Sequence, residues 1–315
     1  MKKILSPRLP PGRRLLFQRP YSAAPTILRR KPRSLIGCKQ LSVLRLVKKI
    51  TGVDVSLYRQ STISRRLQLR LQATGCSSLD GYIKLIQKDP QEAFNFQEHL
   101  LIHVTRFFRD KPVFTYLERR ILPGLIENLF TRQRRTLRVW SIGCATGQEP
   151  FSLAMILYNL TRQRGIHPVI LATDISAKVI TQAREACFRP EEMRPIPRPF
   201  RDLHCLPQKR GGFRIAPNLR RMVVFHQHNL ISDEPLGTFD LILCRNLLIF
   251  FKPEAHDFLL AKIAKALNDE GFLVLGRSES LNSKLGLTLV SSRFHVYQKV
   301  GGKTQSSFSR KGNGR

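Results

Sequence analysis

Acidic residues are scarce in this sequence of 315 residues, and their scarcity limits what the protein binds. Only 22 Asp and Glu stand against 54 Lys and Arg, which gives a formal net charge of +32 at pH 7. Removing the fourteen basic residues before Asp54 and the four after Gly301 still leaves +14 for the middle of the chain. A surplus of this size predicts an anionic partner: nucleic acid, anionic lipid or an acidic protein surface.

Paired cysteines and clustered histidines are also missing. The six cysteines are scattered, none of them forms a CxxC pair, and the eight histidines show no ligand spacing. This pattern argues against a disulfide framework and against a metal centre, and we expect free thiols in a reducing cytosol. The sequence holds no run of about 18 apolar residues, so it predicts no transmembrane helix.

The first forty residues contain many arginines and no acid, a composition shared with mitochondrial transit peptides. Six prolines would interrupt the amphipathic helix that such a peptide forms. We therefore interpret residues 1–40 as a disordered basic arm, or as the result of a start codon placed too early. Residues 301–315 are interpreted as a disordered basic tail.

Hydrophobic spacing typical of helices begins at Leu41. Leu41, Leu44 and Val47 follow a period near 3.6, and Gly52 is expected to end this first helix. Similar spacing predicts three more helices, over 56–73, 79–87 and 90–108. Together they predict a small all-helical domain over residues 41–112.

The pattern changes at about residue 138, where short apolar runs rich in branched residues begin to alternate with helical segments. The runs lie at 138–143, 169–175, 222–230, 239–246, 271–276 and 293–300, with helices at 149–161 and 253–267. Strands with long intervening helices predict a parallel sheet with crossover helices, here over residues 113–300. The proline-rich segment 188–221 breaks the alternation, and its Gly211–Gly212 pair suggests an inserted β-hairpin.

A glycine-rich turn joins the first predicted strand to the first helix of this domain. Gly143 and Gly147 are four residues apart, whereas a nicotinamide site has the spacing GxGxxG. Glycines at this place let the backbone approach a ligand, and the helix start offers unpaired N–H groups. Glu149 stands at the helix start, and a carboxylate there favours a cofactor without phosphate, such as S-adenosylmethionine.

Asp174 ends the second predicted strand. A carboxylate in this position can accept hydrogen bonds from both ribose hydroxyls of a nucleoside. The alternative is that Asp174 caps a helix that starts near Ser176, and the two roles do not exclude each other.

Five segments, in a fixed order, resemble the CheR-type chemotaxis receptor methyltransferases, which are protein-glutamate O-methyltransferases. The most specific is 104–110, Val-Thr-Arg-Phe-Phe-Arg-Asp, which is similar to the family's N-V-T-x-F-F-R. The others are the glycine-rich turn, Asn229-Leu230, residues 240–246 and residues 276–279. The resemblance covers 41–300 and implies a Rossmann-like class I methyltransferase sheet with an all-helical N-terminal domain and a short β-subdomain insertion.

The resemblance also implies S-adenosylmethionine as the cofactor and a cytoplasmic enzyme associated with membrane receptor arrays. The residues that it places around the cofactor are His103, Thr105, Arg109, Gly143, Glu149, Asp174, Asn229, Leu230, Arg245 and Asn246. Arg109 and Phe250 are expected beside the reacting groups. Two positions depart from the family: His103 replaces an asparagine, and Phe250 replaces a tyrosine, so a hydroxyl is missing there.

Methyl transfer to a carboxylate requires positioning rather than a general base, because glutamate has a pKa of about 4.3 and is already ionised at neutral pH. Arg109 can orient either the acceptor carboxylate or the carboxylate of the cofactor by paired hydrogen bonds. The implied partners are methyl-accepting chemotaxis receptors, whose methylation helices are acidic. Arg59, Arg66 and Arg70 lie near one face of the second predicted helix and, by likeness, are expected to dock the receptor; the alternative is a solvated basic stripe.

Two rival functions remain open. The charge of the chain favours a nucleic-acid methyltransferase, but residues 243–247 lack the Asn-Pro-Pro-aromatic signature of amine methylation and no Pro-Cys nucleophile occurs. Cys244 is expected to be a buried strand residue. The second rival is a non-catalytic relative that binds the cofactor without turnover, which Phe250 and His103 would favour.

Overall fold

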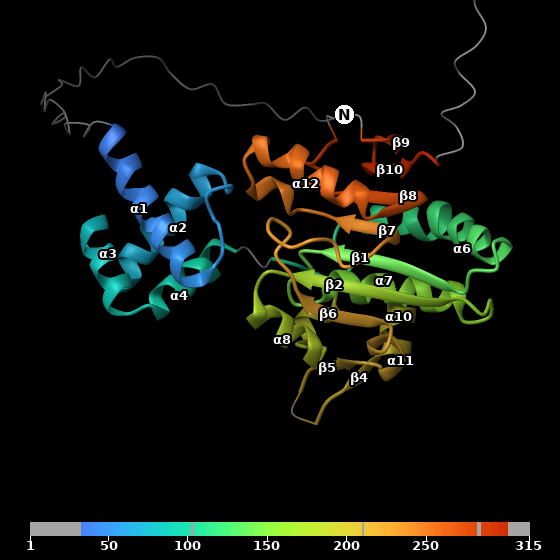
Figure 1. Cartoon of the computed structure of the whole chain (residues 1–315). Coiled ribbons are helices and arrows are strands. Elements are labelled where there is room, and N and C mark those ends of the chain that lie inside the picture. Colours follow the sequence, from blue (N-terminus) through green and yellow to red (C-terminus); the bar gives the residue numbers. More distant parts are fainter. Residues whose placement is uncertain (1–32, 102–103, 210, 282–284, 302–315) are drawn as a thin grey trace, which may run out of the picture.

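The computed structural model describes residues 33–101, 104–209, 211–281 and 285–301. The first of these segments forms a helical bundle, which Figure 1 shows in blue and teal. Its helices are α1 (Arg33–Thr51), α2 (Gln60–Thr74), α3 (Leu79–Lys88) and α4 (Gln91–Leu100). Most of the predicted basic arm, residues 1–32, and nearly all of the predicted tail, residues 302–315, lie outside the described residues.

The bundle corrects three predicted helix boundaries. Helix α1 begins at Arg33 rather than at Leu41. Helix α2 begins at Gln60 rather than at residue 56, because residues 56–57 form a turn and Tyr58 forms an isolated β-bridge with Phe251. Helix α4 ends at Leu100, so the prediction that this helix continues to residue 108 is wrong. Further along, Phe108 has a positive φ of 49°, which a continuous helix does not allow.

A seven-stranded mixed sheet forms the centre of the second part of the chain. Its spatial order is β6-β2-β1-β7-β8-β10-β9. The strands are β1 (Thr136–Ile142), β2 (His167–Asp174), β6 (Val223–Gln227), β7 (Phe239–Cys244), β8 (Leu267–Leu275), β9 (Leu287–Ser291) and β10 (Val296–Lys299). The first five in this order run parallel, and β10 is antiparallel to both of its neighbours. This confirms the predicted Rossmann-like class I methyltransferase fold.

The sheet positions a site at its carboxyl edge. The strand order changes direction next to β1, which has β2 on one side and β7 on the other, and ligands of open α/β sheets bind at such a switch point. In Figure 1 the arrowheads of β1 and β2 point toward the helical bundle, so this edge faces the bundle.

Both faces of the sheet are buried. Successive side chains of a strand point to opposite faces, so each strand contributes to two apolar clusters. Val139 and Leu243 join one apolar cluster with α5 (Lys111–Tyr116), α6 (Leu122–Thr131) and α7 (Gln148–Thr161). Trp140 and Ile242 join the other, together with α12 (Pro253–Lys265) and the helical bundle. The bundle therefore shares one of the two apolar clusters with one face of the sheet.

The hydrophobic pattern missed several elements and one strand boundary. Helices α5 and α6 fill the stretch before β1, where no element was predicted, and they join through a π-helical turn at Leu117–Ile121. Strand β9 lies at the edge of the sheet, and its side chains are all at least partly exposed, so no apolar alternation marks it. Strand β8 begins at Leu267, four residues before the predicted run, because a polar segment with a bulge still pairs with β7.

The predicted inserted hairpin is confirmed. A separate three-stranded sheet contains β3 (Cys187–Phe188), β4 (Cys205–Pro207) and β5 (Phe213–Ile215), in the order β3-β5-β4, with the short helices α9 (Pro190–Met193), α10 (Arg198–His204) and α11 (Pro217–Arg220). Gly212 has a φ of 82°, and a Cβ there would lie 2.7 Å from the carbonyl oxygen of Phe188. Only glycine fits this turn.

A buried ion pair holds α2 and α4 together. The Glu92 carboxylate accepts hydrogen bonds from Arg70 Nε (2.8 Å) and the Tyr82 hydroxyl (2.5 Å). The side chains of Arg70 and Glu92 are only 12% and 5% exposed. Burial raises the pKa of Glu92, but the hydrogen bonds from Arg70 and Tyr82 hold it below its ordinary value of 4.5.

We predict that Glu92→Gln lowers the free energy of unfolding by about 3 kcal/mol, because it leaves the Arg70 charge buried without its partner. Since the folded-state pKa of Glu92 is lowered, the contribution of the pair is full above pH 4.5 and is lost as the pH falls below that value. Urea unfolding between pH 2 and 7 should therefore show less acid sensitivity in the variant. Asp80→Asn, which removes an exposed pair with Lys39, is the control and should cost under about 1 kcal/mol; equal losses in both variants would contradict the prediction.

Candidate functional site

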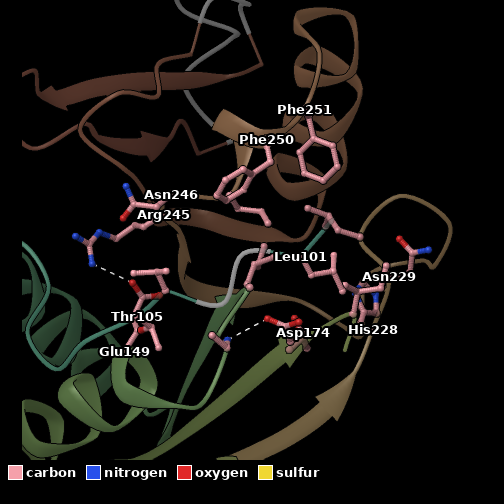
Figure 2. Close-up of a pocket in the computed structure, with 18 of the residues that line it drawn as sticks. Leu101, Thr105, Glu149, Asp174, His228, Asn229, Arg245, Asn246, Phe250 and Phe251 are labelled. Atoms are coloured by element: carbon pink, nitrogen blue, oxygen red, sulfur yellow. Dashed lines mark hydrogen bonds and ion pairs between the residues drawn. The ribbon is translucent and has the colours of Figure 1, made fainter. Parts of the chain in front are cut away.

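A pocket lies at the carboxyl ends of β1, β2 and β7, as the strand order requires. All of the predicted cofactor and reaction residues that the structure describes line it: Thr105, Arg109, Gly143, Glu149, Asp174, Asn229, Leu230, Arg245, Asn246 and Phe250. His103 lies outside the described residues. In Figure 2, one side of the pocket carries Thr105, Glu149, Arg245 and Asn246. The other side carries Asp174, His228 and Asn229.

The glycine-rich turn is fixed by the end of the neighbouring strand. The N–H groups of Gly143 and Cys144 both donate to the carbonyl of Thr173, at 2.8 and 2.9 Å. Gly147 precedes α7 with a φ of 94°, and a Cβ there would press on the ring of Phe225 at 3.1 Å. The turn therefore requires glycine at this position, and it opens the start of α7 toward the pocket.

Asp174 braces the same turn from β2. One carboxylate oxygen accepts from the N–H of Ala145 (3.0 Å) and the other from the N–H of Ser176 (3.0 Å). The helix cap of α8 (Ala177–Glu185) is Ser176, whose hydroxyl accepts from the N–H of Val179. Helix capping is therefore not the role of Asp174. The residue is only 7% exposed, and it lines the pocket.

Arg245 is the most buried charge at the pocket, with its side chain 1% exposed. Its guanidinium donates to Glu149 Oε2, Asp110 Oδ2 and the carbonyl of Arg109, each at 2.9 Å. Glu149 also accepts from the hydroxyl of Ser141 at 2.9 Å. Because both carboxylates are taken up by Arg245, its main contribution is to hold Glu149 and the 104–110 segment in place.

Asn246 follows Arg245 in a left-handed conformation, with a φ of 58°. Glu279 holds this turn: its Oε2 accepts from the N–H groups of Asn246 (2.8 Å) and Gly276 (2.7 Å). A Cβ on Gly276 would lie 2.7 Å from the Asn246 nitrogen, so no other residue fits there. The Gly-Arg-Ser-Glu segment therefore positions Asn246 against the pocket.

Two buried acceptors at the pocket have no partner among the described residues. One is Oδ1 of Asn246 and the other is Nδ1 of His228, whose Nε2 donates to the carbonyl of Glu234 at 3.0 Å. Both line the pocket and both require a hydrogen-bond donor. The ammonium group and the adenine amine of S-adenosylmethionine are donors of this kind, so these residues fit the expected cofactor.

His228 and Tyr58 are pocket residues that sequence reasoning missed. Tyr58 comes from the helical part of the chain and lies with its ring 4.8 Å from that of Phe251. Burial, and next the charge of Asp174, raise the pKa of Tyr58, so its hydroxyl keeps its proton at neutral pH. The position of His228 directly before Asn229 was a usable signal, whereas the position of Tyr58 was not, because only tertiary pairing brings it here.

The three predicted docking residues do not behave alike. Arg70 is wrong as a docking residue, because its guanidinium is buried against Glu92. Arg59 is exposed and donates to the carbonyl of Phe251 at 3.1 Å, beside the pocket wall. Arg66 is partly exposed and forms no ion pair within the described part of the chain. Docking through this face therefore reduces to Arg59 and Arg66.

Cys244 lies in β7 with no exposed surface, as predicted. Burial raises its pKa well above the ordinary value, and the charges of Glu279 and Glu149 raise it further. A thiol in this state is not a nucleophile. Across the described residues, no group of three or more His, Cys, Asp or Glu side chains is arranged to hold a metal ion.

None of the helices in the described part of the chain combines the length and the hydrophobicity that a membrane span needs.

Two family profiles match the chain. A profile described as "CheR methyltransferase, SAM binding domain" matches residues 103–294, and one described as "CheR methyltransferase, all-alpha domain" matches residues 42–101. The first covers the sheet except β10 and most of the residues that line the pocket, and the second covers most of the helical bundle. Most of the pocket therefore lies in a domain whose cofactor is S-adenosylmethionine.

Curated relatives agree with these profiles. A "Chemotaxis protein methyltransferase" of Listeria monocytogenes is 31% identical over 254 residues, which are 80% of this chain and 94% of that protein. A protein of the same name from Borreliella burgdorferi is 28% identical over 79% of this chain and 90% of its own length. An uncharacterized 104.1 kDa protein of Rhodobacter capsulatus is 32% identical over 86% of this chain, but the matched part is only 28% of that protein.

Solved structures align only in part. The complex of PKMT2 from Rickettsia typhi with AdoHcy aligns with a TM-score of 0.29 and 19% identity, over 45% of this chain and 21% of that chain. This likeness is too small to support a conclusion. The family of the chain is shown by the family profiles and the curated relatives.

We predict that Arg245→Lys weakens the binding of S-adenosylmethionine at least about tenfold. Lysine cannot form the forked bonds that hold Glu149 and Asp110 together, and a bond between charged groups contributes about 1.5–3 kcal/mol. Titration calorimetry measures the change directly. Arg134→Lys is the matched control, because Arg134 pairs with Asp240 at the opposite edge of the sheet; an unchanged Kd in Arg245→Lys would refute the role of the network.

Proposed function

The chain belongs to the CheR methyltransferase family, and from this premise we propose that it transfers a methyl group from S-adenosylmethionine to glutamate side chains of methyl-accepting chemotaxis receptors. The family membership makes the protein an S-adenosylmethionine-dependent methyltransferase of the chemotaxis type. The receptor and the glutamate ester are the parts that we propose.

Among the described residues, one end of the pocket offers no free base, and this observation carries the proposal. Near Asn246 and Phe250, the carboxylate of Glu149 is engaged by hydrogen bonds from Arg245 and Ser141, and His228 lies on the opposite side (Figure 2). The described polar and aromatic side chains that remain for an acceptor are a guanidinium, a hydroxyl, an amide and an aromatic ring. An acceptor that must lose a proton would find no base among them, whereas a glutamate carboxylate, with a pKa of about 4.3, needs none.

The described residues suggest a division of roles. When bound, S-adenosylmethionine supplies an electrophilic methyl group on a sulfonium. We propose that Asp174 accepts from the ribose hydroxyls, that Asn229 and Leu230 border the nucleoside, and that Asn246 Oδ1 accepts from the ammonium group. Arg109, whose Nη1 donates only to the carbonyl of Val104 (2.9 Å) within the described residues, orients a carboxylate.

The basic surface supports an acidic protein partner. Arg59 lies beside the pocket wall, where its Nε donates to the carbonyl of Phe251, and Arg66 lies further along α2 without an ion pair among the described residues. The high charge of the chain also suits nucleic acid, but Cys244 is too buried to act as the nucleophile of ring-carbon methylation. The reaction test below separates the two partners.

We predict that the full chain transfers radiolabelled methyl groups from S-adenosylmethionine to receptor-containing membranes, and that mild alkali releases the label as methanol. Release by alkali identifies a carboxyl methyl ester, and heat-treated membranes and Arg245→Lys serve as controls. Label in added RNA but not in receptor would overturn the proposal in favour of a nucleic-acid substrate. Cofactor binding without any transfer would instead favour a non-catalytic relative.

We predict that Phe250→Tyr raises kcat by about two- to tenfold and leaves the Kd for the cofactor unchanged. The added hydroxyl can donate one hydrogen bond to the acceptor carboxylate, which is worth about 0.5–1.5 kcal/mol. Phe258→Tyr, on the exposed face of α12, is the control and should have no effect. If Phe250→Tyr also leaves kcat unchanged, the missing hydroxyl does not limit the reaction.

A further inference from the structure

A second hollow of about 510 Å³ adjoins the pocket, and the segment 104–110 forms a wall of both. Thr105 and Arg109 line the pocket, whereas Arg106 and Asp110 line the second hollow. We name this hollow the basic cleft, after the four cations on its walls: Arg106, Lys111, Arg277 and Arg293. Its floor contains Phe107, Phe108 and Val113, which are at most 5% exposed.

The charge of the basic cleft is not neutralised from within the described part of the chain. All four cations are exposed, and none of them forms an ion pair with a described residue. The guanidinium of Arg293 lies 5.4 Å from the centre of the Phe294 ring, which holds it without compensating its charge. Asp110 is the one carboxylate among the described lining residues, and it is bonded to the buried Arg245 at 2.9 Å.

The basic cleft is connected to the side of the pocket that carries Asn246, where we place the methyl acceptor, and not to the side that carries Asp174, where we place the nucleoside. Arg277 follows Gly276, whose N–H shares the Glu279 carboxylate with the N–H of Asn246. Arg106 follows Thr105, which lies on the same side of the pocket as Asn246 (Figure 2). A chain that places a side chain beside Asn246 and Arg109 therefore passes over the basic cleft.

We propose that the basic cleft binds acidic side chains that flank the target glutamate on a helical segment of the substrate protein. This inference rests on the proposed function and deepens it. Side chains three or four residues apart on a helix lie about 5–6 Å from one another, so a helix with one glutamate in the pocket carries its next acidic residues over the adjoining wall. The guanidinium groups of Arg277 and Arg293 match carboxylates with paired hydrogen bonds. Phe107 and Phe108 are buried, and the partly exposed ring of Phe294 already packs on Tyr116 and under the Arg293 guanidinium. Little ring surface is therefore left on which bases could stack, which favours a protein over nucleic acid.

The test compares Arg277→Glu/Arg293→Glu with Lys265→Glu. Arg277 follows the carboxyl end of β8, and Lys265 precedes its start, so the control reverses an exposed charge at the opposite edge of the sheet. We expect the double variant to raise the KM for receptor at least about tenfold, since several weak surface pairs become repulsive. The kcat at saturating receptor and the Kd for S-adenosylhomocysteine should stay within twofold of the wild-type values. Arg277→Lys/Arg293→Lys, which keeps the charge, should recover most of the affinity.

The outcomes separate this inference from the proposed function. If wild type and Lys265→Glu form receptor methyl esters and the double variant does so with an unchanged KM, the inference is wrong and the function stands. An unchanged KM for receptor together with weaker binding of an RNA oligonucleotide would assign the basic cleft to nucleic acid and overturn the inference. A loss of S-adenosylhomocysteine binding in the double variant would show damage to the pocket and would also count against it. No methyl ester from any of the proteins would overturn the function and the inference together.

Discussion

The site depends on one buried guanidinium. Arg245 leaves water almost completely, and a charge can do so only when its surroundings replace the lost hydration. Two carboxylates, one carbonyl oxygen and the ring of Phe114, 5.4 Å away, provide this replacement. These partners belong to the segment after α4, to the first turn of α7 and to α5. A single side chain at the end of β7 thus fixes residues 109–114 and the first turn of α7, two segments that are far apart in sequence both from each other and from β7.

The helical bundle is also attached to the sheet around the site. Its apolar residues continue into the face of the sheet that carries Trp140, and its backbone pairs with the segment after β7. A further contact joins the sheet domain to α4: the hydroxyl of Ser176, at the start of α8, donates to Glu98 at 2.9 Å. The pocket is consequently walled by both parts of the chain, with Tyr58 and Leu101 on the bundle side.

The sequence identified the parts of the site that follow from local rules. Gly143, Asp174 and Asn246 lie where strands end, and parallel strands bring their carboxyl ends to one edge, so these residues could be placed together before any coordinates. Tyr58 could not be found in this way, because it reaches the pocket only through pairing with Phe251, 193 positions along the chain. Arg70 was misjudged for a related reason: helical spacing shows which face a side chain occupies, but not that Glu92 of another helix lies on that face. Strand β9 was missed because an exposed edge strand has no apolar alternation to detect.

The attachment between α2 and the pocket wall is made largely by main-chain atoms. Arg59 N donates to the carbonyl of Phe250 (2.9 Å), and Lys252 N donates to the carbonyl of Leu57 (2.8 Å). Main-chain hydrogen bonds do not depend on which side chain a residue carries, except that proline has no N–H to donate. Outward-facing residues of α2 can therefore be substituted during evolution without detaching the helix from the pocket wall. The binding preference of this helix face and the chemistry of the pocket can therefore change independently, which gives the fold a simple route by which duplicated copies acquire new partners.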